Sequence, residues 1–450
     1  MNADKMKIDR IPNGTVRVPS SKSVGHRALI CAALAGGEKA LEGVSGLDMN
    51  DDLRATKAGI LKIIAGDRSE PVDCGESGST LRFLIPVAAA FGGEWTFTGR
   101  GRLMERPLDI YKDVFESHGG FFRQDAGTVA IRGRLTPGRY ELPGDVSSQF
   151  ITGLLLALPL LNGESEIVLT APLESANYVD LTLDVMNAFG VDAFDGEGGE
   201  WEVMEITTGA SSGPAVSTSA LASDAPAGWR VPGGQVYKRA KYAVEGDWSQ
   251  AAFFLCAGAL GARVSVEGLS PASLQGDMRI LSVLKSMGAD VDATLRPALF
   301  ARKRSCTIRA FLPQSGLKGI TIDVSHIPDL VPPIAALACF AAGTTRITGA
   351  SRLRLKESDR IAALVTELGK LGADISADGG DIIIRGRERL DGGEADAWND
   401  HRIAMALAVA SVGCTSPVYL TGAESVGKSY PKFWDDFLRI ANPNIKEAAS

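Results

Sequence analysis

The fold of this chain is decided by a pattern that is clearest in STLRFLIPVAAAFG (residues 79–92), which Trp95-Thr96-Phe97 follows. The stretch begins with polar residues, continues with apolar and alanine-rich residues typical of a buried helix, and stops at glycine, a frequent helix terminator. Aromatic and β-branched residues then favour a strand. The stretch therefore predicts a unit made of a helix, a glycine stop and a strand.

The same pattern recurs six times. The predicted helical segments are Ser23–Gly36, Ser79–Gly92, Ser148–Gly163, Ser249–Gly261, Asp329–Gly343 and Asp400–Gly413. Strands are predicted after five of them, at Trp95–Phe97, Ile167–Leu169, Val264–Val266, Thr345–Ile347 and Val418–Leu420. A second set of helices is predicted to end at Gly119, Gly190, Gly288 and Gly372. Such repeats predict an α/β protein built from six two-helix units.

Composition narrows the class of protein. The 450 residues are 45% apolar and include 51 glycines, which fits a well-packed α/β protein of two or three domains. Residues 1–18 lack the apolar run of a signal peptide, and no stretch is apolar for long enough to cross a bilayer, so we expect a cytoplasmic protein without membrane contact. The six cysteines include no Cys-x-x-Cys pair, which favours buried free thiols over disulfides or zinc. A net charge of -7 argues against a nucleic-acid partner.

Basic residues gather where predicted loops enter helices. They are Lys22, Arg27, Arg82, Arg106, Arg354, Lys356, Arg360, Arg402 and Lys428. A helix N-terminus carries a partial positive charge and free N–H groups, so cations placed there create a site for anions. RLKESDR (residues 354–360) is the densest example. On a helix, Lys356 and Arg360 share a face and Glu357 points elsewhere. A solvated helix start is the alternative for this segment taken alone.

Two short motifs could indicate other functions. GAESVGKS (residues 422–429) fits the phosphate-loop pattern, but only 21 residues follow it, too few for the rest of a nucleotide-triphosphate fold. We interpret it as coincidental, with Lys428 still a candidate phosphate ligand. GESGS (residues 75–79) lacks the last glycine of a nucleophile elbow. We interpret it as a turn whose N–H groups meet a phosphate, with an ordinary turn as the alternative.

Five segments, in order along the chain, resemble the signature segments of the EPSP synthase family, the 3-phosphoshikimate 1-carboxyvinyltransferases. They are VPSSKSVGHRAL (residues 18–29), DVSSQF (145–150), HIPD (326–329), LKESDR (355–360) and NDHR (399–402). The resemblance implies an inside-out α/β barrel of two domains, each with three repeats, with helices inside and sheets outside. It implies one domain at residues 20–244 and another at residues 1–19 and 245–450, because Glu245-Gly246-Asp247 resembles the second crossing between them.

The resemblance also implies an activity: transfer of the enolpyruvyl group of phosphoenolpyruvate to the 5-hydroxyl of shikimate 3-phosphate, with release of phosphate. The chemistry requires a base near the hydroxyl and an acid at the methylene carbon, and no metal or cofactor. The family pattern makes Asp329 the base, Glu357 the acid/base and Lys22 a cation between the substrates. From the residues alone, Asp329 could also cap the helix that runs through Pro332 and Pro333.

Binding roles follow from the same segments. The resemblance implies that shikimate 3-phosphate contacts Lys22, Ser23, Arg27, Ser147, Ser148, Gln149, Ser175, Tyr178, Asp329 and Lys356. It implies that phosphoenolpyruvate contacts Lys22, Gly78, Arg106, Gln149, Arg360, Arg402 and Lys428. Arginine suits a carboxylate because its planar fork grips both oxygens. The ordinary alternatives are helix caps at Ser147 and Ser148, a surface amide at Gln149 and a turn residue at Arg106.

Some features depart from the family or leave alternatives open. Glu76 and His26 stand where many members have Asn, and Leu353 where some have Trp, which leaves the response to inhibitors open. Residues Thr207–Gly234 are predicted to be a flexible insertion. The sister transferase that acts on UDP-N-acetylglucosamine uses a loop cysteine, which the matching residues Gly99–Asp113 lack. The other alternative is a non-enzymatic protein that binds phosphorylated metabolites. We expect the protein to be a monomer.

Overall fold

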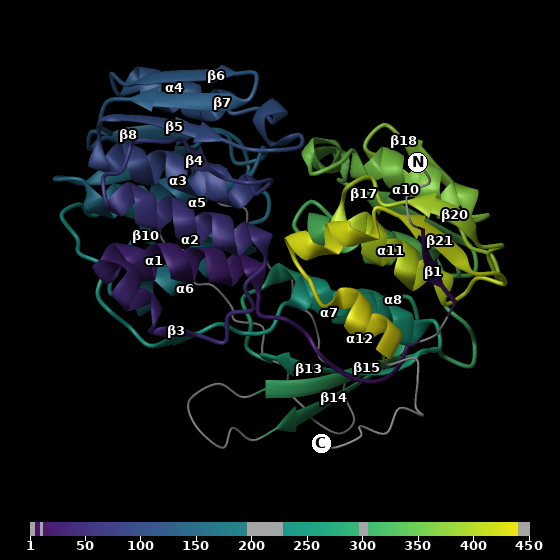
Figure 1. Cartoon of the computed structure of the whole chain (residues 1–450). Coiled ribbons are helices and arrows are strands. Elements are labelled where there is room, and N and C mark those ends of the chain that lie inside the picture. Colours follow the sequence, from purple (N-terminus) through teal and green to yellow (C-terminus); the bar gives the residue numbers. More distant parts are fainter. Residues whose placement is uncertain (1–4, 10–11, 196–227, 297–304, 440–450) are drawn as a thin grey trace. The chain divides into compact units, whose positions relative to one another are not determined.

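Residues 5–9, 12–195, 228–296 and 305–439 are described by the computed structural model, and they divide into two units (Figure 1). The N-terminal unit contains the described part of residues 20–244. The C-terminal unit contains the described parts of residues 1–19 and 245–450. Each unit holds six α-helices and three sheets within its described residues. The prediction of an α/β fold made of six repeats, three in each half, is therefore confirmed.

The six helices that the repeats predicted form the interior of the two units. They are α1 (Lys22–Leu41), α3 (Gly78–Phe91), α5 (Ser148–Ala157), α7 (Trp248–Ala259), α9 (Val331–Ala338) and α11 (His401–Ser411). Every residue of α7 and α9 is buried. The outer helices are α2 (Asp51–Ile64), α4 (Asp109–Ser117), α6 (Asn177–Ala188), α8 (Ile280–Ser286), α10 (Arg360–Lys370) and α12 (Phe433–Arg439). Helices that are apolar on all sides belong in a core, which explains the alanine-rich repeats.

Helix boundaries differ from the prediction by up to two turns. The capping side chains of α1, α3 and α7 are Ser21, Ser77 and Asp247, each two residues before the predicted start. The predicted polar starts therefore lie inside the first turn, because a serine there resembles a cap in sequence. The glycine stop is correct at Gly92, which ends α3 with a φ of 76°. In contrast, α5 ends at Ala157, six residues before Gly163.

Four sheets share one topology. In the order across each sheet given below, the first two strands pair in parallel, and the third and fourth strands each pair antiparallel with the strand before them. In the N-terminal unit they are β4 (Val72–Asp73), β5 (Glu94–Thr98), β7 (Thr128–Arg132) and β6 (Phe121–Asp125), then β8 (Arg139–Leu142), β9 (Ser165–Leu169), β11 (Gly228–Val231) and β10 (Phe194–Asp195). In the C-terminal unit they are β2 (Asn13–Arg17), β13 (Arg263–Leu269), β15 (Ser305–Phe311) and β14 (Asp290–Arg296), then β16 (Thr321–Asp323), β17 (Thr344–Thr348), β19 (Asp381–Arg385) and β18 (Asp374–Asp378).

The remaining two sheets are shorter versions of the same arrangement. One pairs β20 (Gly393–Asp396) parallel with β21 (Val418–Thr421), to which β1 (Met6–Ile8) adds antiparallel. The other pairs β3 (Val44–Ser45) parallel with β12 (Tyr242–Ala243). All five strands predicted after the glycine stops are present. The N-terminal segment supplies β1 and β2 to sheets of the C-terminal unit, which explains why the first residues group with the last repeats.

The prediction of a flexible insertion at Thr207–Gly234 is wrong for one part of that segment. Gly228–Val231 forms strand β11, which pairs with β9 and places Trp229 opposite Ile167. Trp229 is buried, so packing outweighs the glycine- and proline-rich surroundings that indicated a flexible segment. Residues 207–227 of the same prediction lie outside the described residues.

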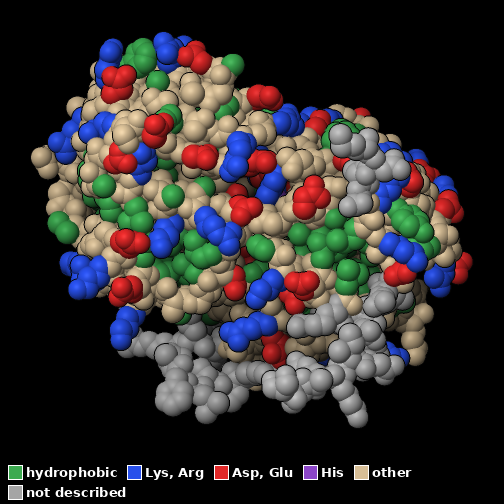
Figure 2. Space-filling view, in the orientation of Figure 1, with side chains coloured by type: hydrophobic (Ala, Val, Ile, Leu, Met, Phe, Trp, Pro, Cys, Tyr) green, Lys and Arg blue, Asp and Glu red, His purple; other side chains and the backbone are tan. Residues whose placement is uncertain are grey.

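Other predictions from composition can be compared with the structure. All six cysteines are free, and five of them are buried; burial raises the pKa of Cys306 to about 11. In the part of the chain that the structure describes, no helix is long and apolar enough to span a membrane. On the face drawn in Figure 2, basic and acidic side chains are interspersed and form no broad basic area.

Candidate active site

The N-terminus of α1 holds the first predicted site residues. Lys22 donates to Asp52 in the first turn of α2, with 2.7 Å between Nζ and Oδ2. Arg27, only 2% exposed, donates to Thr182, Thr152 and the carbonyl oxygens of Ser23 and Tyr178. These four bonds occupy four of its five N–H donors. Burial lowers the pKa of Arg27 to about 10. Arg27 therefore ties α1 to α5 and α6.

The predicted serines and tyrosine lie at the N-terminal ends of α5 and α6, the two helices that Arg27 contacts. Ser147 caps α5 by accepting from the Gln149 backbone N–H, so its ordinary role as a cap is confirmed. Ser175 precedes α6 with a φ of 59°, a left-handed conformation that is costly for a non-glycine residue. Tyr178 lies in the first turn of α6, and its carbonyl oxygen accepts from Arg27 at 2.8 Å. The helix starts that carry these residues therefore meet around one guanidinium.

A second group of basic residues surrounds the start of α3, and we call it the Gly78 cradle: Gly78, Ser79, Arg82, Arg106 and Gln149. A Cβ atom added at Gly78 would lie 2.6 Å from Arg106 Nη1 and 3.1 Å from Arg82 Nη1. Arg82 donates to Gln149 Oε1 at 2.8 Å, and Gln149 donates to Ser79 Oγ at 2.9 Å. Two buried guanidiniums, an amide and a helix N-terminus thus converge on the one residue without a side chain, an arrangement suited to an anion such as phosphate.

In the C-terminal unit the predicted residues and Asp400 form a compact ionic group, the Asp329 cluster: Asp329, Lys356, Glu357, Arg360, Asp400 and Arg402. Asp329 lies in the 3-10 helix η4 (Pro328–Leu330) before α9. Its Oδ1 is 3.1 Å from Arg360 Nη1 and 3.9 Å from Lys356 Nζ, and its Oδ2 is 3.1 Å from Arg402 Nη2. Asp329 does not cap α9, so that alternative role is wrong. Its side chain is held by three cations instead.

Arg360 is the centre of this cluster, with a side chain only 1% exposed. It donates to both carboxylate oxygens of Asp400, at 2.8 and 3.2 Å, and to Glu357 at 2.7 Å. The prediction that Glu357 points away from the basic pair is therefore wrong. The reason is that α10 begins only at Arg360, with Asp359 as its cap, so Glu357 lies in the preceding turn and not on a helical face.

Burial and neighbouring charges shift the pKa values of residues in the cluster. Burial alone would raise the pKa of Asp329, but Arg402, Lys356 and Arg360 together hold it well below its ordinary value. Burial opposes the charge on Arg360, yet Asp400 and Glu357 raise its pKa above the ordinary value. Beside these three cations Asp329 is therefore an ionised carboxylate with little tendency to take up a proton.

Lys428 is the last residue of the 3-10 helix η6 (Ala423–Lys428). Its Nζ donates to the carbonyl oxygen of Asn399 at 2.6 Å, and Asn399 directly precedes Asp400. The segment that fits the phosphate-loop pattern is thus a 3-10 helix followed by the short α12. A phosphate loop needs an open loop that leads into a long helix, so our interpretation of the motif as coincidental agrees with this geometry.

Arg82 and Asp400, which belong to these groups, and Asp277, which interacts electrostatically with Asp329, had no assigned catalytic or binding role. Arg82 and Asp400 were visible only as members of a basic set and of the NDHR segment. The third is Asp277, in the 3-10 helix η3 (Gly276–Arg279), which accepts a hydrogen bond from Ser249 at the start of α7. Asp277 is 3% exposed, and burial, with the nearby charge of Asp329, raises its pKa to about 7. No sequence signal distinguished this carboxylate from a surface one.

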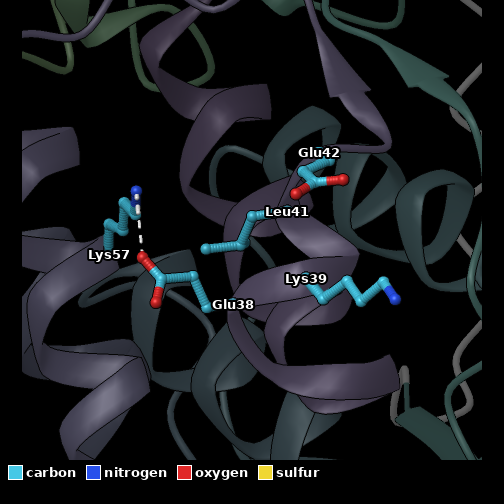
Figure 3. A pocket seen from close by; sticks show the side chains of 5 residues that line it. All are labelled: Glu38, Lys39, Leu41, Glu42 and Lys57. Atoms are coloured by element: carbon cyan, nitrogen blue, oxygen red, sulfur yellow. Dashed lines mark ion pairs between the residues drawn. The ribbon is translucent and has the colours of Figure 1, made fainter.

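His26 and a surface pocket take no part in these groups. His26 is buried against Thr56, with 2.7 Å between Nδ1 and Oγ1, and burial followed by the charge of Lys22 lowers its pKa well below the ordinary value. The pocket lies at the other end of α1 (Figure 3) and is lined by Glu38, Lys39, Leu41, Glu42 and Lys57. Within the described residues, no group of three or more potential ligands could hold a metal ion.

Comparisons with known proteins point to one family. The family model of EPSP synthase (3-phosphoshikimate 1-carboxyvinyltransferase) matches residues 7–216 and 220–437. Enzymes with the latter name from Clostridium kluyveri and Clostridium novyi are 42% and 40% identical, each over 95% of both chains.

Solved structures show the same likeness. An EPSP synthase from Acinetobacter baumannii matches with a TM-score of 0.72 and 25% identity, over 97% of this chain and 98% of the other. The enolpyruvyl transferase NikO from Streptomyces tendae, at 16% identity and a TM-score of 0.67 over 97% of this chain and 96% of the other, shares the fold. Because both the family model and the curated relatives cover almost the whole chain, this protein belongs to the EPSP synthase family of enolpyruvyl transferases.

Proposed function

We propose that the Gly78 cradle, the N-termini of α1, α5 and α6, and the Asp329 cluster transfer the enolpyruvyl group of phosphoenolpyruvate to the 5-hydroxyl of shikimate 3-phosphate. Phosphate is the second product. The family membership supports the reaction, and the arrangement of cations and carboxylates in the two units supports the assignment of residues.

The reaction needs proton transfers at two atoms. A base takes the proton of the 5-hydroxyl as its oxygen bonds to C2 of phosphoenolpyruvate, and an acid protonates the C3 methylene, which gives a tetrahedral adduct. Removal of one C3 proton then expels phosphate as the C2–O bond breaks. We assign the hydroxyl proton to Asp329 and the C3 proton to Glu357. Lys22 stabilises negative charge that develops on oxygen between the substrates.

One observation carries this proposal: the two carboxylates are held by the same guanidinium. Arg360 is 3.1 Å from Asp329 and 2.7 Å from Glu357. Arg360 is itself fixed by Asp400, which caps α11. The cluster therefore supplies two oriented acid–base groups beside cations that suit a substrate carboxylate.

The anionic groups of the substrates are assigned to the remaining residues. The phosphate of phosphoenolpyruvate is assigned to Lys22, Gly78, Arg106, Gln149 and Lys428, and its carboxylate to Arg360 and Arg402. The phosphate of shikimate 3-phosphate is assigned to Ser147, Ser148, Ser175 and Lys356, its carboxylate to Ser23 and Arg27, and its ring to Tyr178. Helix N-termini support the phosphate assignments. Arg27 can offer a ligand only the N–H that its four internal bonds leave.

The organisation of the protein is proposed on similar grounds. We propose that residues 20–244 form one domain and that residues 1–19 and 245–450 form the other, in a monomeric cytoplasmic enzyme. The pairing of β1 with β21 and of β2 with β13 supports the domain boundaries. Light scattering of the purified protein checks the monomer, because a dimer would double the measured mass.

A phosphate-release assay tests the proposed function. The protein is mixed with phosphoenolpyruvate and shikimate 3-phosphate, and in parallel with phosphoenolpyruvate and UDP-N-acetylglucosamine. We expect release only with the shikimate substrate, and the Asp329→Asn variant controls for contaminating enzyme. Phosphate release only in the reaction with UDP-N-acetylglucosamine would show that this compound is the acceptor. Binding of shikimate 3-phosphate without release of phosphate would indicate a non-enzymatic protein.

A further inference from the structure

Asp329 pairs with the two arginines that the proposed function gives to a substrate carboxylate. Its Oδ1 pairs with Arg360 Nη1 and its Oδ2 with Arg402 Nη2, both at 3.1 Å. Arg402 also donates through Nη1 to the Asp329 backbone carbonyl at 3.1 Å. A carboxylate whose two oxygens bridge two guanidiniums is the arrangement expected of a bound carboxylate ligand.

We propose that Asp329 is an internal competitor for phosphoenolpyruvate: its carboxylate fills the substrate's carboxylate subsite until phosphoenolpyruvate displaces it. This inference rests on the proposed function. It assigns Asp329 a role in setting affinity, in addition to its role as the base. The substrate that binds therefore also releases the group that acts next.

The two arginines differ in how firmly they are held. Arg360 is fixed by two hydrogen bonds that it donates to Asp400, a fully buried carboxylate that also accepts a hydrogen bond from Ser358. Its position is thus set without Asp329. Arg402 lies in the first turn of α11 and reaches Asp329 through both terminal nitrogens. Exchange of Asp329 for a substrate carboxylate therefore changes the partner of Arg402 most.

Charge counting supports an exchange over a simple addition. The cluster contains three cations, Arg360, Arg402 and Lys356, and three carboxylates, Asp329, Glu357 and Asp400. Asp277, on η3, adds a further acidic group within range of Asp329. A carboxylate added to this balanced, buried group would leave an excess negative charge, which is unfavourable in a low-dielectric site. Movement of Asp329 away from the arginines relieves that excess.

The exchange also changes the base. While the three cations surround Asp329, its pKa is held low, and a weakly basic carboxylate accepts a hydroxyl proton poorly. When the substrate carboxylate takes Arg402 and part of Arg360, the pKa of Asp329 rises. The base is therefore weak while Asp329 is paired with the arginines and becomes competent when phosphoenolpyruvate has replaced it there.

Binding of phosphoenolpyruvate alone, without the acceptor, tests the inference because no turnover can occur. Calorimetric titration of the Asp329→Asn and Asp329→Ala variants should show about tenfold tighter binding than the wild type, since the competing carboxylate is gone. The matched control is Glu357→Gln, which removes a carboxylate that contacts Arg360 at 2.7 Å, on the neighbouring Nη2. Its affinity should rise less. Equal or weaker binding by both Asp329 variants would overturn the inference.

The same substitution made in the Arg402→Ala protein distinguishes competition at Arg402 from a general effect of removing a negative charge. If the gain acts through Arg402, the Asp329→Asn substitution should give little tightening when Arg402 is already alanine. The same tenfold gain in that background would contradict exchange at Arg402. Melting curves provide an independent readout: phosphoenolpyruvate should raise the Tm of Asp329→Asn more than that of the wild type, because its carboxylate replaces the one that the two arginines lost.

The phosphate-release assay distinguishes the two levels of the argument. Turnover by the wild type, with no tightening in the Asp329 variants, rejects the internal competitor and leaves the proposed function intact. Absence of both turnover and phosphoenolpyruvate binding in the wild type rejects the proposed function, and the inference with it.

Discussion

The Gly78 cradle and the Asp329 cluster both place arginines near helix N-termini, but they differ in what lies between the arginines. In the cradle, Arg82 and Arg106 lie against Gly78, and Arg82 donates to the neutral amide of Gln149. In the cluster, the space between Arg360 and Arg402 is filled by the carboxylate of Asp329.

This difference corresponds to two ways of building an anion site. A phosphate that binds Arg82 in the cradle competes with the neutral amide of Gln149. A carboxylate can enter the cluster only by replacing one that belongs to the protein. Substitutions in the cluster should therefore change chemistry and affinity together, whereas substitutions in the cradle should change affinity alone.

The largest effect is expected from Asp329→Asn. Loss of a positioned acid–base group should lower kcat about a hundredfold or more. Binding of phosphoenolpyruvate should be no weaker, because the amide no longer competes for the arginines. Steady-state assays and titrations measure the two quantities separately. Adding Glu357→Gln should cost less than the product of the single losses, since both groups serve one sequence of steps. Near-normal turnover of Asp329→Asn would remove this residue from the mechanism.

Arg402→Ala should come next. Loss of one charge-assisted, partly desolvated contact should weaken phosphoenolpyruvate by about 2 to 4 kcal/mol. Shikimate 3-phosphate alone should bind almost as before, because its groups are assigned elsewhere. Calorimetry with each substrate in turn measures this, and a collapse of the shikimate 3-phosphate affinity would show that Arg402 serves the other substrate.

Gly78→Ala tests the cradle. The new Cβ would meet Arg106 Nη1 at 2.6 Å and Arg82 Nη1 at 3.1 Å, so both flexible side chains must shift. Displacement of this kind should weaken phosphoenolpyruvate by about 1 to 3 kcal/mol and leave kcat nearly unchanged. Gly369→Ala in α10 is a matched control, because a Cβ there meets nothing within 4 Å. An unchanged KM for phosphoenolpyruvate would show that the cradle does not hold its phosphate.

The smallest effect concerns Asp277 and pH. Its pKa is raised to about 7, above the ordinary value of 3.8, so the unfolded chain releases this proton at a lower pH than the folded protein, and the wild type loses stability as the pH rises from about 4 to about 7. Asp277→Asn should therefore gain about 1 kcal/mol of stability over the wild type between pH 6 and pH 8. Melting temperatures at both values measure the gain, and Ser249→Ala, which keeps the carboxylate, should not show it. A difference that is constant with pH would mean that Asp277 titrates outside this range.

Local signals were sufficient for most of the fold. Runs such as residues 79–97 carry a helix, a stop and a strand within about twenty residues, and the structure has α3, Gly92 and β5 there. Capping was harder, because Ser77 and Ser79 are equally good caps in sequence and only Ser77 precedes the first turn. The strand at Gly228–Val231 was missed because burial of Trp229 depends on β9, about sixty residues earlier.

The candidate site depended more on distant contacts. Asp329 meets Arg360 across 31 residues and the backbone of Asp329 meets Arg402 across 73. The sequence indicated that these residues belong to one site, through the family resemblance, but not that they pair with one another. Neither the contact of Glu357 with Arg360 nor the burial of Asp277 leaves a local signal, because both depend on where α10 begins and on how η3 packs against α7.

Transfer of hydrogen at C3 of phosphoenolpyruvate tests the central claim most directly. The reaction is run in D2O with phosphoenolpyruvate and shikimate 3-phosphate, and the product is examined by NMR. If Glu357 protonates C3 from solvent and one of three hydrogens is later removed, deuterium must appear in the vinyl group of the product. The account predicts this incorporation. A product formed at the normal rate without deuterium would show that C3 is never protonated, and would contradict the mechanism.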